Sequence, residues 1–253
     1  MFYDKLCRIK GYILYICAFC FIFAFFVLLL FAFAKTSMTA VTPKICVADF
    51  MCLLGGGNFI NLAVIPLCSV FITILADKNC TGVNYYIRNK SRTSIILKRI
   101  KKIFIFSFVL SFLALAISAA VGGLFTAEII NWTEYDSYSF VTTQVILDIS
   151  FIKVLLLTFA QLIFPITFFS CLLCTISLVC KKTFAFIIVV LVSGSNFFGF
   201  LKYFIDCIFN YSFSEVTYLS FSSVVLIFGV FPLLILLTVL AAVKLVKRKD
   251  VLN

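Results

Sequence analysis

Residues 103–127 read IFIFSFVLSFLALAISAAVGGLFTA, and stretches of this kind decide the fold of the chain. The stretch contains no Asp, Glu, Lys or Arg, and about 20 mostly apolar residues are enough for a helix to cross a bilayer. Apolar residues make up 64% of the 253 residues, and the mean hydropathy is +1.22. Too little polar surface remains to cover a body dissolved in water. The sequence therefore predicts an integral membrane protein.

Six long uncharged runs occupy most of the chain. None of them alternates apolar and polar residues, as the strands of a transmembrane barrel do, so helices are expected to satisfy the backbone in lipid. The start of the second span stays open between Phe50 and Phe59, because the glycines at 55–57 can break a helix at its surface. We predict an all-α integral membrane protein with a single transmembrane domain, residues 1–253, and spans at 12–34, 54–76, 103–126, 154–179, 183–201 and 219–243.

Basic residues are unevenly distributed between the two sides that six spans would create. Seventeen of the 21 Lys and Arg residues fall in the two termini, in the loop 77–102 and in the turn 180–183, whereas seven of the ten acidic residues fall on the other side. Lys and Arg accumulate on the cytoplasmic side of membrane proteins. This pattern predicts that both termini are cytoplasmic and that the loop 127–150 is extracellular. The net charge of +11 then reflects topology and acidic lipid headgroups, and no nucleic-acid partner is expected.

Residue types that carry catalysis are scarce in this sequence. The chain has no His, and no ionisable Asp, Glu, Lys or Arg interrupts the six runs. It also lacks the GxxxxGK[ST] loop that binds nucleotide phosphates. Cys-x-x-Cys spacing occurs twice in apolar runs without polar support for metal or redox chemistry, and these cysteines are interpreted as packing residues: Cys17, Cys20, Cys171 and Cys174. We therefore expect no catalytic residue, metal or cofactor in this chain.

Small and polar residues within the spans predict contacts between helices. Small residues recur at contact spacing in the third span: Ala114, Ala116, Ser118, Ala120 and Gly122. Gln161 and Asn196 are strongly polar, and each either lines a path or bonds to a neighbouring helix.

The predicted extracellular side also carries cysteines and aromatic residues. Cys46, Cys52 and Cys207 fall there or at the outer membrane edge, and this odd number allows at most one disulfide. Trp132 lies in the loop 127–150, where an interfacial aromatic belt is the expected role.

The loop 77–102 is the longest predicted cytoplasmic segment and reads DKNCTGVNYYIRNKSRTSIILKRIKK. Ser91 or Ser94 can start a helix. The residues Ile95, Ile96, Leu97, Ile100 and Ile103 give the following basic segment an apolar face. We predict a helix that lies along the inner leaflet and then turns into the third span. Physical chemistry alone supports a snorkelling basic anchor and a partner-docking element equally.

This loop resembles that of the type-two ATP-binding-cassette (ABC) permeases, including bacterial exporters of peptides, drugs and lantibiotics. An acidic residue after the second span is followed by Gly, an extended stretch, Ser-Arg and Lys, here Asp77, Gly82, Ser91, Arg92 and Lys98. The six-span layout matches along the whole chain. The family often has Pro before the Ser-Arg pair, where this chain has Asn89 and Lys90.

The resemblance implies that the loop forms a coupling helix in contact with a separate ABC ATPase subunit. The implied contact residues are Asp77, Gly82, Arg88, Ser91, Arg92 and Lys98, with a second contact at Lys181 and Lys182. It also implies an amphipathic N-terminal helix at residues 2–10. Two ATPase subunits, which would bind ATP and Mg²⁺, and a second identical or related permease subunit would complete a transporter in a bacterial plasma membrane.

The expected function is ATP-driven export of an amphipathic or hydrophobic cargo, best matched by a peptide toxin or bacteriocin. A path without charged residues suits such a cargo. One alternative is a secondary transporter, in which Pro66, Pro165 and Pro232 would mark broken helices. The other is a membrane scaffold or immunity protein that binds a partner without moving cargo.

Overall fold

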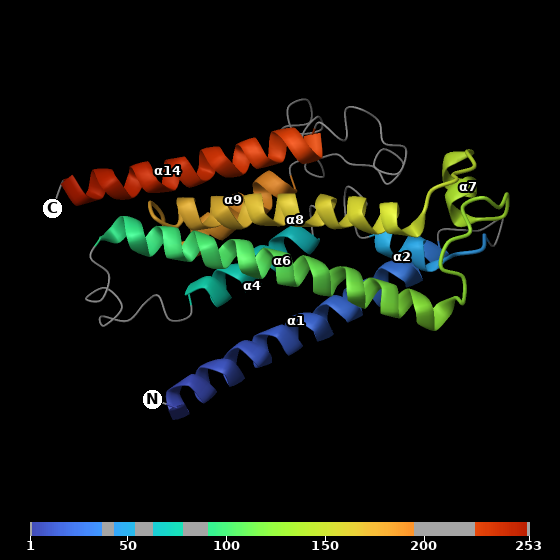
Figure 1. Cartoon of the computed structure of the whole chain (residues 1–253), viewed down its shortest axis with the longest axis horizontal. Coiled ribbons are helices and arrows are strands. Elements are labelled where there is room, and N and C mark those ends of the chain that lie inside the picture. The colour runs from blue at the N-terminus through green and yellow to red at the C-terminus, as the bar shows by residue number, and fades with distance from the viewer. Residues whose placement is uncertain (1, 37–42, 54–62, 78–90, 195–225, 252–253) are drawn as a thin grey trace.

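The part of the chain that the computed structural model describes, residues 2–36, 43–53, 63–77, 91–194 and 226–251, is mostly helical (Figure 1). Within these residues the structure has one isolated backbone bridge, between Lys44 and Ser137, and no strand. The all-α prediction is confirmed. The elements are α1 (Phe2–Thr36), α2 (Val47–Leu53), α4 (Ile65–Asp77), α6 (Arg92–Phe125), α7 (Tyr138–Thr143), α8 (Phe151–Ile176), α9 (Lys182–Ser193), the π-helical turn η2 (Leu226–Val230) and α14 (Phe231–Val251).

Four helical stretches of the described chain are long and apolar enough to cross a membrane. They overlap the predicted first, third, fourth and sixth spans and cover Gly11–Leu29, Arg92–Phe125, Phe151–Ile176 and Phe228–Lys247. At the predicted second and fifth spans, α4 and α9 have 13 and 12 residues, fewer than a crossing needs. The rest of these two spans, at 54–62 and 195–201, lies outside the described residues.

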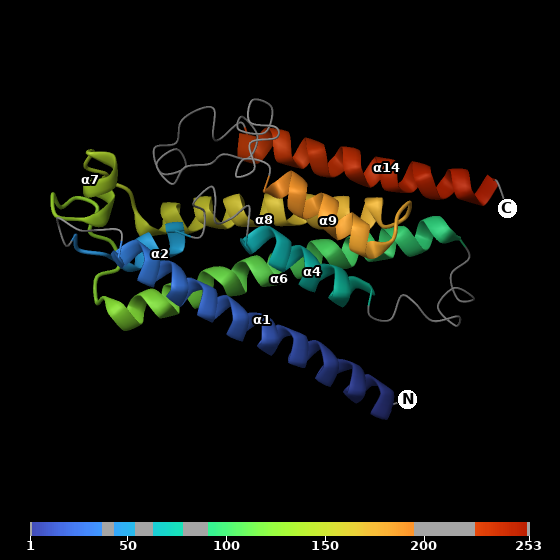
Figure 2. The ribbon, with the colours of Figure 1, turned by 180° about the vertical axis from the view of Figure 1, so that it is seen from behind.

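The helices form a bundle with two different ends (Figures 1 and 2). One end, called the basic end here, holds both chain termini, the end of α4, the start of α6 and the turn between α8 and α9. The opposite end carries the cap, defined as residues 43–53 and 126–150, which includes α2 and α7. The basic segments 92–102, 181–182 and 244–249 all lie at the basic end. The uneven charge along the sequence is thus an uneven charge between the ends of the bundle.

The core lies where α1, α4, α6, α8 and α14 pack against one another. Its largest members are aromatic, with Phe19, Phe169 and Phe231 at most 1% exposed. Some hydroxyl groups in these helices bond one turn back, as in Thr158 Oγ1 to the Val154 carbonyl (2.8 Å) and Ser170 Oγ to the Ile166 carbonyl (2.7 Å). These polar side chains are therefore satisfied without a partner helix.

Small residues of α6 allow α2 to approach it closely. Ser118 Oγ donates a hydrogen bond of 2.6 Å to the Phe50 carbonyl. A Cβ atom at Gly122 would lie 3.1 Å from the Phe50 ring, whereas one at Gly123 would meet no atom within 4 Å. Ala114 and Ser118 are fully buried, which confirms the predicted close packing along this stripe. The neighbouring stripe, Ala116 and Ala120, is exposed.

Two predicted helix boundaries are wrong. The basic segment does not form an inner-leaflet helix that turns into the third span, because α6 is continuous from Arg92 to Phe125. No Gly or Pro occurs in it before Gly122, so nothing interrupts helix propagation. Similarly, residues 2–10 are the first turns of α1 and not a separate N-terminal helix. The single Gly11 at the junction costs about 1 kcal/mol relative to Ala, which a long helix tolerates.

The contact of Phe50 with Gly122 predicts different outcomes for two adjacent glycines. Gly122→Val forces the side chain into the Phe50 ring and is expected to cost about 1–3 kcal/mol of unfolding free energy through overpacking. Gly123→Val faces open space and is the matched control. Thermal unfolding of the detergent-purified variants, followed by circular dichroism, measures the difference. Equal unfolding midpoints would contradict the packing of α2 on α6.

Candidate functional site

Three charged side chains meet at the basic end of the bundle. Asp77 is the last residue of α4, Arg99 lies in α6, and Lys182 is the first residue of α9. Asp77 Oδ1 lies 2.6 Å from Arg99 Nε, and Lys182 Nζ donates a hydrogen bond of 2.6 Å to Asp77 Oδ2. The side chains of Asp77 and Arg99 are 14% and 11% exposed, whereas that of Lys182 is 63% exposed. One largely buried carboxylate therefore joins three helices, and these residues are called the Asp77 cluster.

The start of α6 positions Arg99 in this cluster. Ser91 caps the helix by accepting a 3.2 Å hydrogen bond from the Ser94 N–H. Of the two predicted helix starts, Ser91 and Ser94, the structure uses Ser91. Arg99 shares a face with the buried residues Ile96 and Ile103. It is itself 9% exposed, and its Nη2 has no hydrogen-bond partner within the described part of the chain. Among the described residues this buried guanidinium nitrogen therefore has no acceptor, which is costly in a dry site.

A second lysine of α6 secures the end of α4. Lys102 Nζ donates a 3.4 Å hydrogen bond to the Ala76 carbonyl, one of the last carbonyls of that helix. A cation at a helix C-terminus satisfies free carbonyls and opposes the negative end of the helix dipole. The last turn of α4 is therefore held by α6 through both its backbone and its Asp77 side chain.

The predicted contact residues divide into three groups. Asp77 and Lys182 come from the two predicted contacts and are bonded directly. Ser91, Arg92, Lys98 and Lys181 are exposed at the same end of the bundle. Gly82 and Arg88 lie outside the described residues, as does most of the predicted coupling loop.

Arg99 is a member of the cluster that the sequence analysis did not select. The apolar face predicted for this segment included Leu97, which is 49% exposed, and passed over the buried Arg99. Arg99 lies three residues after Ile96 and four before Ile103, so it falls on the apolar face of the helix. A basic residue at that position is the sequence pattern that could have identified it. Its pairing with Asp77 depends on the packing of α4 against α6 and has no local signature.

The structure describes one of the two polar residues predicted within spans, Gln161. Gln161 is 3% exposed on α8 and lies inside the bundle, not on an open surface. Asn196 lies outside the described residues.

The cap contains a second buried carboxylate, Asp49 of α2. Trp132 Nε1 donates a hydrogen bond of 2.7 Å to Asp49 Oδ1, and the backbone N–H and Sγ of Cys46 donate to Oδ2 at 2.9 and 3.2 Å. Burial raises the pKa of Asp49, and these donors partly oppose the rise. Trp132 is 1% exposed, so its predicted interfacial role is wrong. The bond from its indole to Asp49 draws the ring into the cap.

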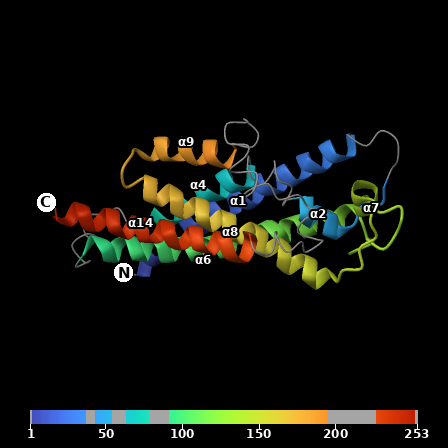
Figure 3. The same cartoon turned by 90° about the horizontal axis from the view of Figure 1, so that it is seen from above.

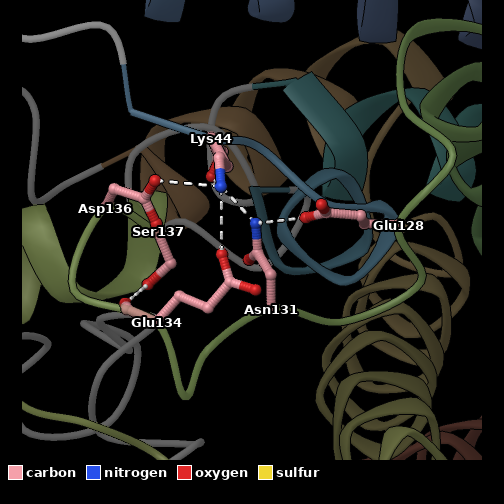
Figure 4. A network of polar contacts seen from close by, with 6 residues as sticks. All are labelled: Lys44, Glu128, Asn131, Glu134, Asp136 and Ser137. Carbon is pink, nitrogen blue, oxygen red and sulfur yellow. Dashed lines mark hydrogen bonds and ion pairs between the residues drawn. The ribbon is translucent and has the colours of Figure 1, made fainter.

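A polar network with exposed charged side chains and a buried asparagine, Asn131, holds the rim of the cap together (Figure 4). Lys44 Nζ lies 3.0 Å from Asp136 Oδ2 and 3.3 Å from Glu134 Oε2. Asn131 Nδ2 donates to the Lys44 carbonyl at 3.3 Å and to Glu128 Oε2 at 2.9 Å. Backbone bonds from Lys44 N to the Asp136 carbonyl and from Tyr138 N to the Lys44 carbonyl, 2.8 and 2.9 Å, complete the link. The network ties the chain before α2 to the segment after α6.

The cap cysteines have no sign of redox or metal chemistry in the described residues. Cys46 and Cys52 are free and buried, and Cys207 lies outside the described part. Burial, with a smaller contribution from the Asp49 charge, raises the pKa of Cys46 to about 12, so its thiol stays protonated. Within the described chain, no group of three potential ligands of the His, Cys, Asp or Glu type could hold a metal ion.

The Asp77 cluster predicts a strong coupling between two substitutions. Asp77→Asn leaves Arg99 buried without its counter-charge and should lower the unfolding free energy by about 3 kcal/mol. Arg99→Gln should cost a similar amount, and the double variant should lose much less than the sum. Lys182→Gln, which removes an exposed partner, should cost at most about 1 kcal/mol. Equilibrium unfolding in mixed micelles measures the cycle, and additive losses would contradict a buried Asp77–Arg99 pair.

Trp132→Phe should destabilise the cap in a pH-dependent manner. Because the pKa of Asp49 is raised in the folded protein, the folded protein holds this proton at pH values above 3.8, where the unfolded chain has lost it. The free energy of unfolding therefore falls as the pH rises through the folded pKa of Asp49. Removing the indole donor penalises the ionised carboxylate, so the N–H contribution of about 1–3 kcal/mol should appear near pH 8 and shrink near pH 4. The lost ring volume contributes equally at both pH values. An identical loss in unfolding free energy at both would show that the indole N–H does not stabilise the Asp49 carboxylate.

Comparison with known proteins finds no match: neither a protein family, nor a curated protein, nor a solved structure matches this chain. The function is therefore inferred from the chain's own residues.

Proposed function

We propose that this chain is the membrane-spanning permease subunit of an ATP-driven exporter, with its basic end in the cytosol and its cap outside. The observation that supports this function best is the Asp77 cluster. It joins Asp77, the residue that begins the predicted coupling loop, to Lys182, the first residue of α9, so one residue of each predicted ATPase contact lies beside the other. A docking subunit that pushes on either segment would act on α4, α6 and α9 together.

Charge supports the proposed orientation. Lys and Arg are concentrated in the described segments 92–102, 181–182 and 244–249, whereas the cap carries Asp49, Glu128, Glu134, Asp136 and Asp148. Basic residues within short distances of span ends favour the cytoplasmic side. An acidic cap would then face the exterior of a plasma membrane.

The Asp77 cluster also leaves positive charge for an acidic group of a partner. It combines two cations with one carboxylate, and one of the cations, Lys182, is 63% exposed. Lys181 and Arg92 add exposed positive charge at the same end. This combination suits an acidic contact surface on a partner subunit, since charge complementarity orients association.

The nature of the spans favours an amphipathic or hydrophobic cargo, with a peptide toxin or bacteriocin as our specific proposal. The four candidate spans contain no Asp or Glu, the residues that usually carry coupling protons or sodium in secondary transporters. Energy would come from ATP and Mg²⁺ on the partner ATPase, two copies of which would serve a pair of permease subunits.

Association with the ATPase encoded by a neighbouring gene tests this proposal. Co-purification should yield a complex whose ATP hydrolysis is faster than that of the ATPase alone. The pair Arg92→Glu and Lys181→Glu should weaken association severalfold, because it reverses exposed charge at the basic end. Lys153→Glu is the matched control, since Lys153 is exposed at the start of α8, next to the cap.

A loop variant separates specific docking from non-specific attraction. Replacing residues 78–90 by a Gly/Ser segment of equal length should abolish the stimulation of ATP hydrolysis. Unchanged association and stimulation would contradict docking through this loop. Transport driven by an ion gradient without any ATPase would instead identify a secondary transporter.

A further inference from the structure

Two apolar cavities lie along the seam between α6 and α8. One, of about 370 Å³, lies between these helices and α14, and the other, of about 340 Å³, lies between them near α2. Both volumes are within the range of small-molecule sites. Their walls are apolar except for Thr167, and the α6 wall is open to the outside of the bundle, with Phe104, Phe108 and Phe112 44–60% exposed.

The register of the two helices places these cavities in line along one seam, and the two together are called the groove here. On α6 the lining follows the four-residue ridge Phe104, Phe108, Phe112 and Ala116, and on α8 it follows Leu155, Phe159, Ile163 and Thr167. The helices run in opposite directions side by side (Figures 1 and 3). The Phe108 and Phe159 rings meet at 5.3 Å between centroids, where one section ends and the next begins.

The depth of the groove matches one leaflet of a bilayer. From Lys101 to Ala116 is 15 residues of α6, or about 22 Å along the helix. Half of a bilayer, headgroups included, is about 20–22 Å thick. With Lys101 at the headgroup level, the groove runs from the apolar edge at Phe104 down to the bilayer midplane at Ala116.

Two lysines flank the basic end of the groove. Lys101 is exposed on α6 and shares a face with Phe104 and Phe108, three and seven residues further on. Lys247 is exposed on α14, eight residues beyond the lining residue Val239 and next to the buried Val246. The packing of Ile100 with Val246 in one cluster keeps these two helix segments adjacent.

We propose that this groove binds an acidic phospholipid of the leaflet at the basic end, with one acyl chain along the α6–α8 seam and the phosphate between Lys101 and Lys247. Apolar walls of leaflet depth suit the chain, and the lysines at the mouth suit the headgroup. This site is independent of ATP-driven transport.

A second copy of this chain fits the groove less well. Two copies in one membrane share the same orientation, so a two-fold contact through this face would bring Lys101 and Lys247 against their own equivalents. Like charges at a contact are unfavourable, whereas a lipid phosphate neutralises them.

Photocrosslinking of the full chain in vesicles tests the proposal. Phosphatidylglycerol or phosphatidylcholine carrying a photoreactive group in the middle of one acyl chain is the probe, and mass spectrometry maps the labelled peptides. We expect labelling within 104–116 and 155–163, with phosphatidylglycerol favoured about fivefold or more. Lys101→Gln with Lys247→Gln should remove this preference. Millimolar inorganic phosphate should not compete, since free phosphate lacks the acyl chain.

Two neighbouring alanines provide the matched variants. Ala116→Phe fills the groove and should reduce labelling severalfold, whereas Ala120→Phe makes the same change at an exposed position of α6 outside the groove lining. Equal unfolding midpoints of the two variants establish that a loss of labelling is local. Equal labelling of the variants, or no preference between the two lipids, would overturn the proposal. Crosslinked dimers through 104–116 in place of lipid adducts would identify a second copy as the occupant.

Discussion

The cost of an unpaired backbone N–H or C=O in hydrocarbon is the constraint on which this structure depends. Each such group costs several kcal/mol, so an apolar chain in lipid satisfies its backbone within helices. The long uncharged runs of this sequence therefore become α1, α6, α8 and α14, and hydroxyl side chains such as Thr158 bond within their own helix. Charged side chains are left for the two ends, where the chain can make specific polar contacts.

The polar contacts at the two ends of the bundle differ in kind. At the cap, Asp49 is enclosed by Trp132 and Cys46, and an exposed network around Lys44 holds the rim, which favours a fixed structure. At the basic end, Asp77 joins three helices through only two ion pairs, with Lys182 largely exposed. In the proposed function, a partner subunit would act on the bundle through these few long-range charge contacts.

The sequence was sufficient for the features that depend on local composition. Uncharged length located the long helices, Ser91 marked the start of α6, and the small residues at 114, 118 and 122 marked a close contact. The sequence was not sufficient for features that depend on contacts between helices. Arg99 is buried because α4 brings Asp77 to it, and Trp132 is buried because α2 brings Asp49 to it. The turn expected after the basic segment is absent because α6 contains no residue that breaks a helix there.

The central claim, a bundle oriented with its basic end in the cytosol, is tested most directly by thiol labelling. Cys180 is a native exposed cysteine in the turn before α9, and Tyr135, 72% exposed in the cap, can be replaced by Cys. In intact cells, a membrane-impermeant maleimide should label Tyr135→Cys and should reach Cys180 only after the membrane is permeabilised. Labelling of Cys180 in intact cells, with Tyr135→Cys protected until permeabilisation, would contradict the orientation and the functional proposal that depends on it.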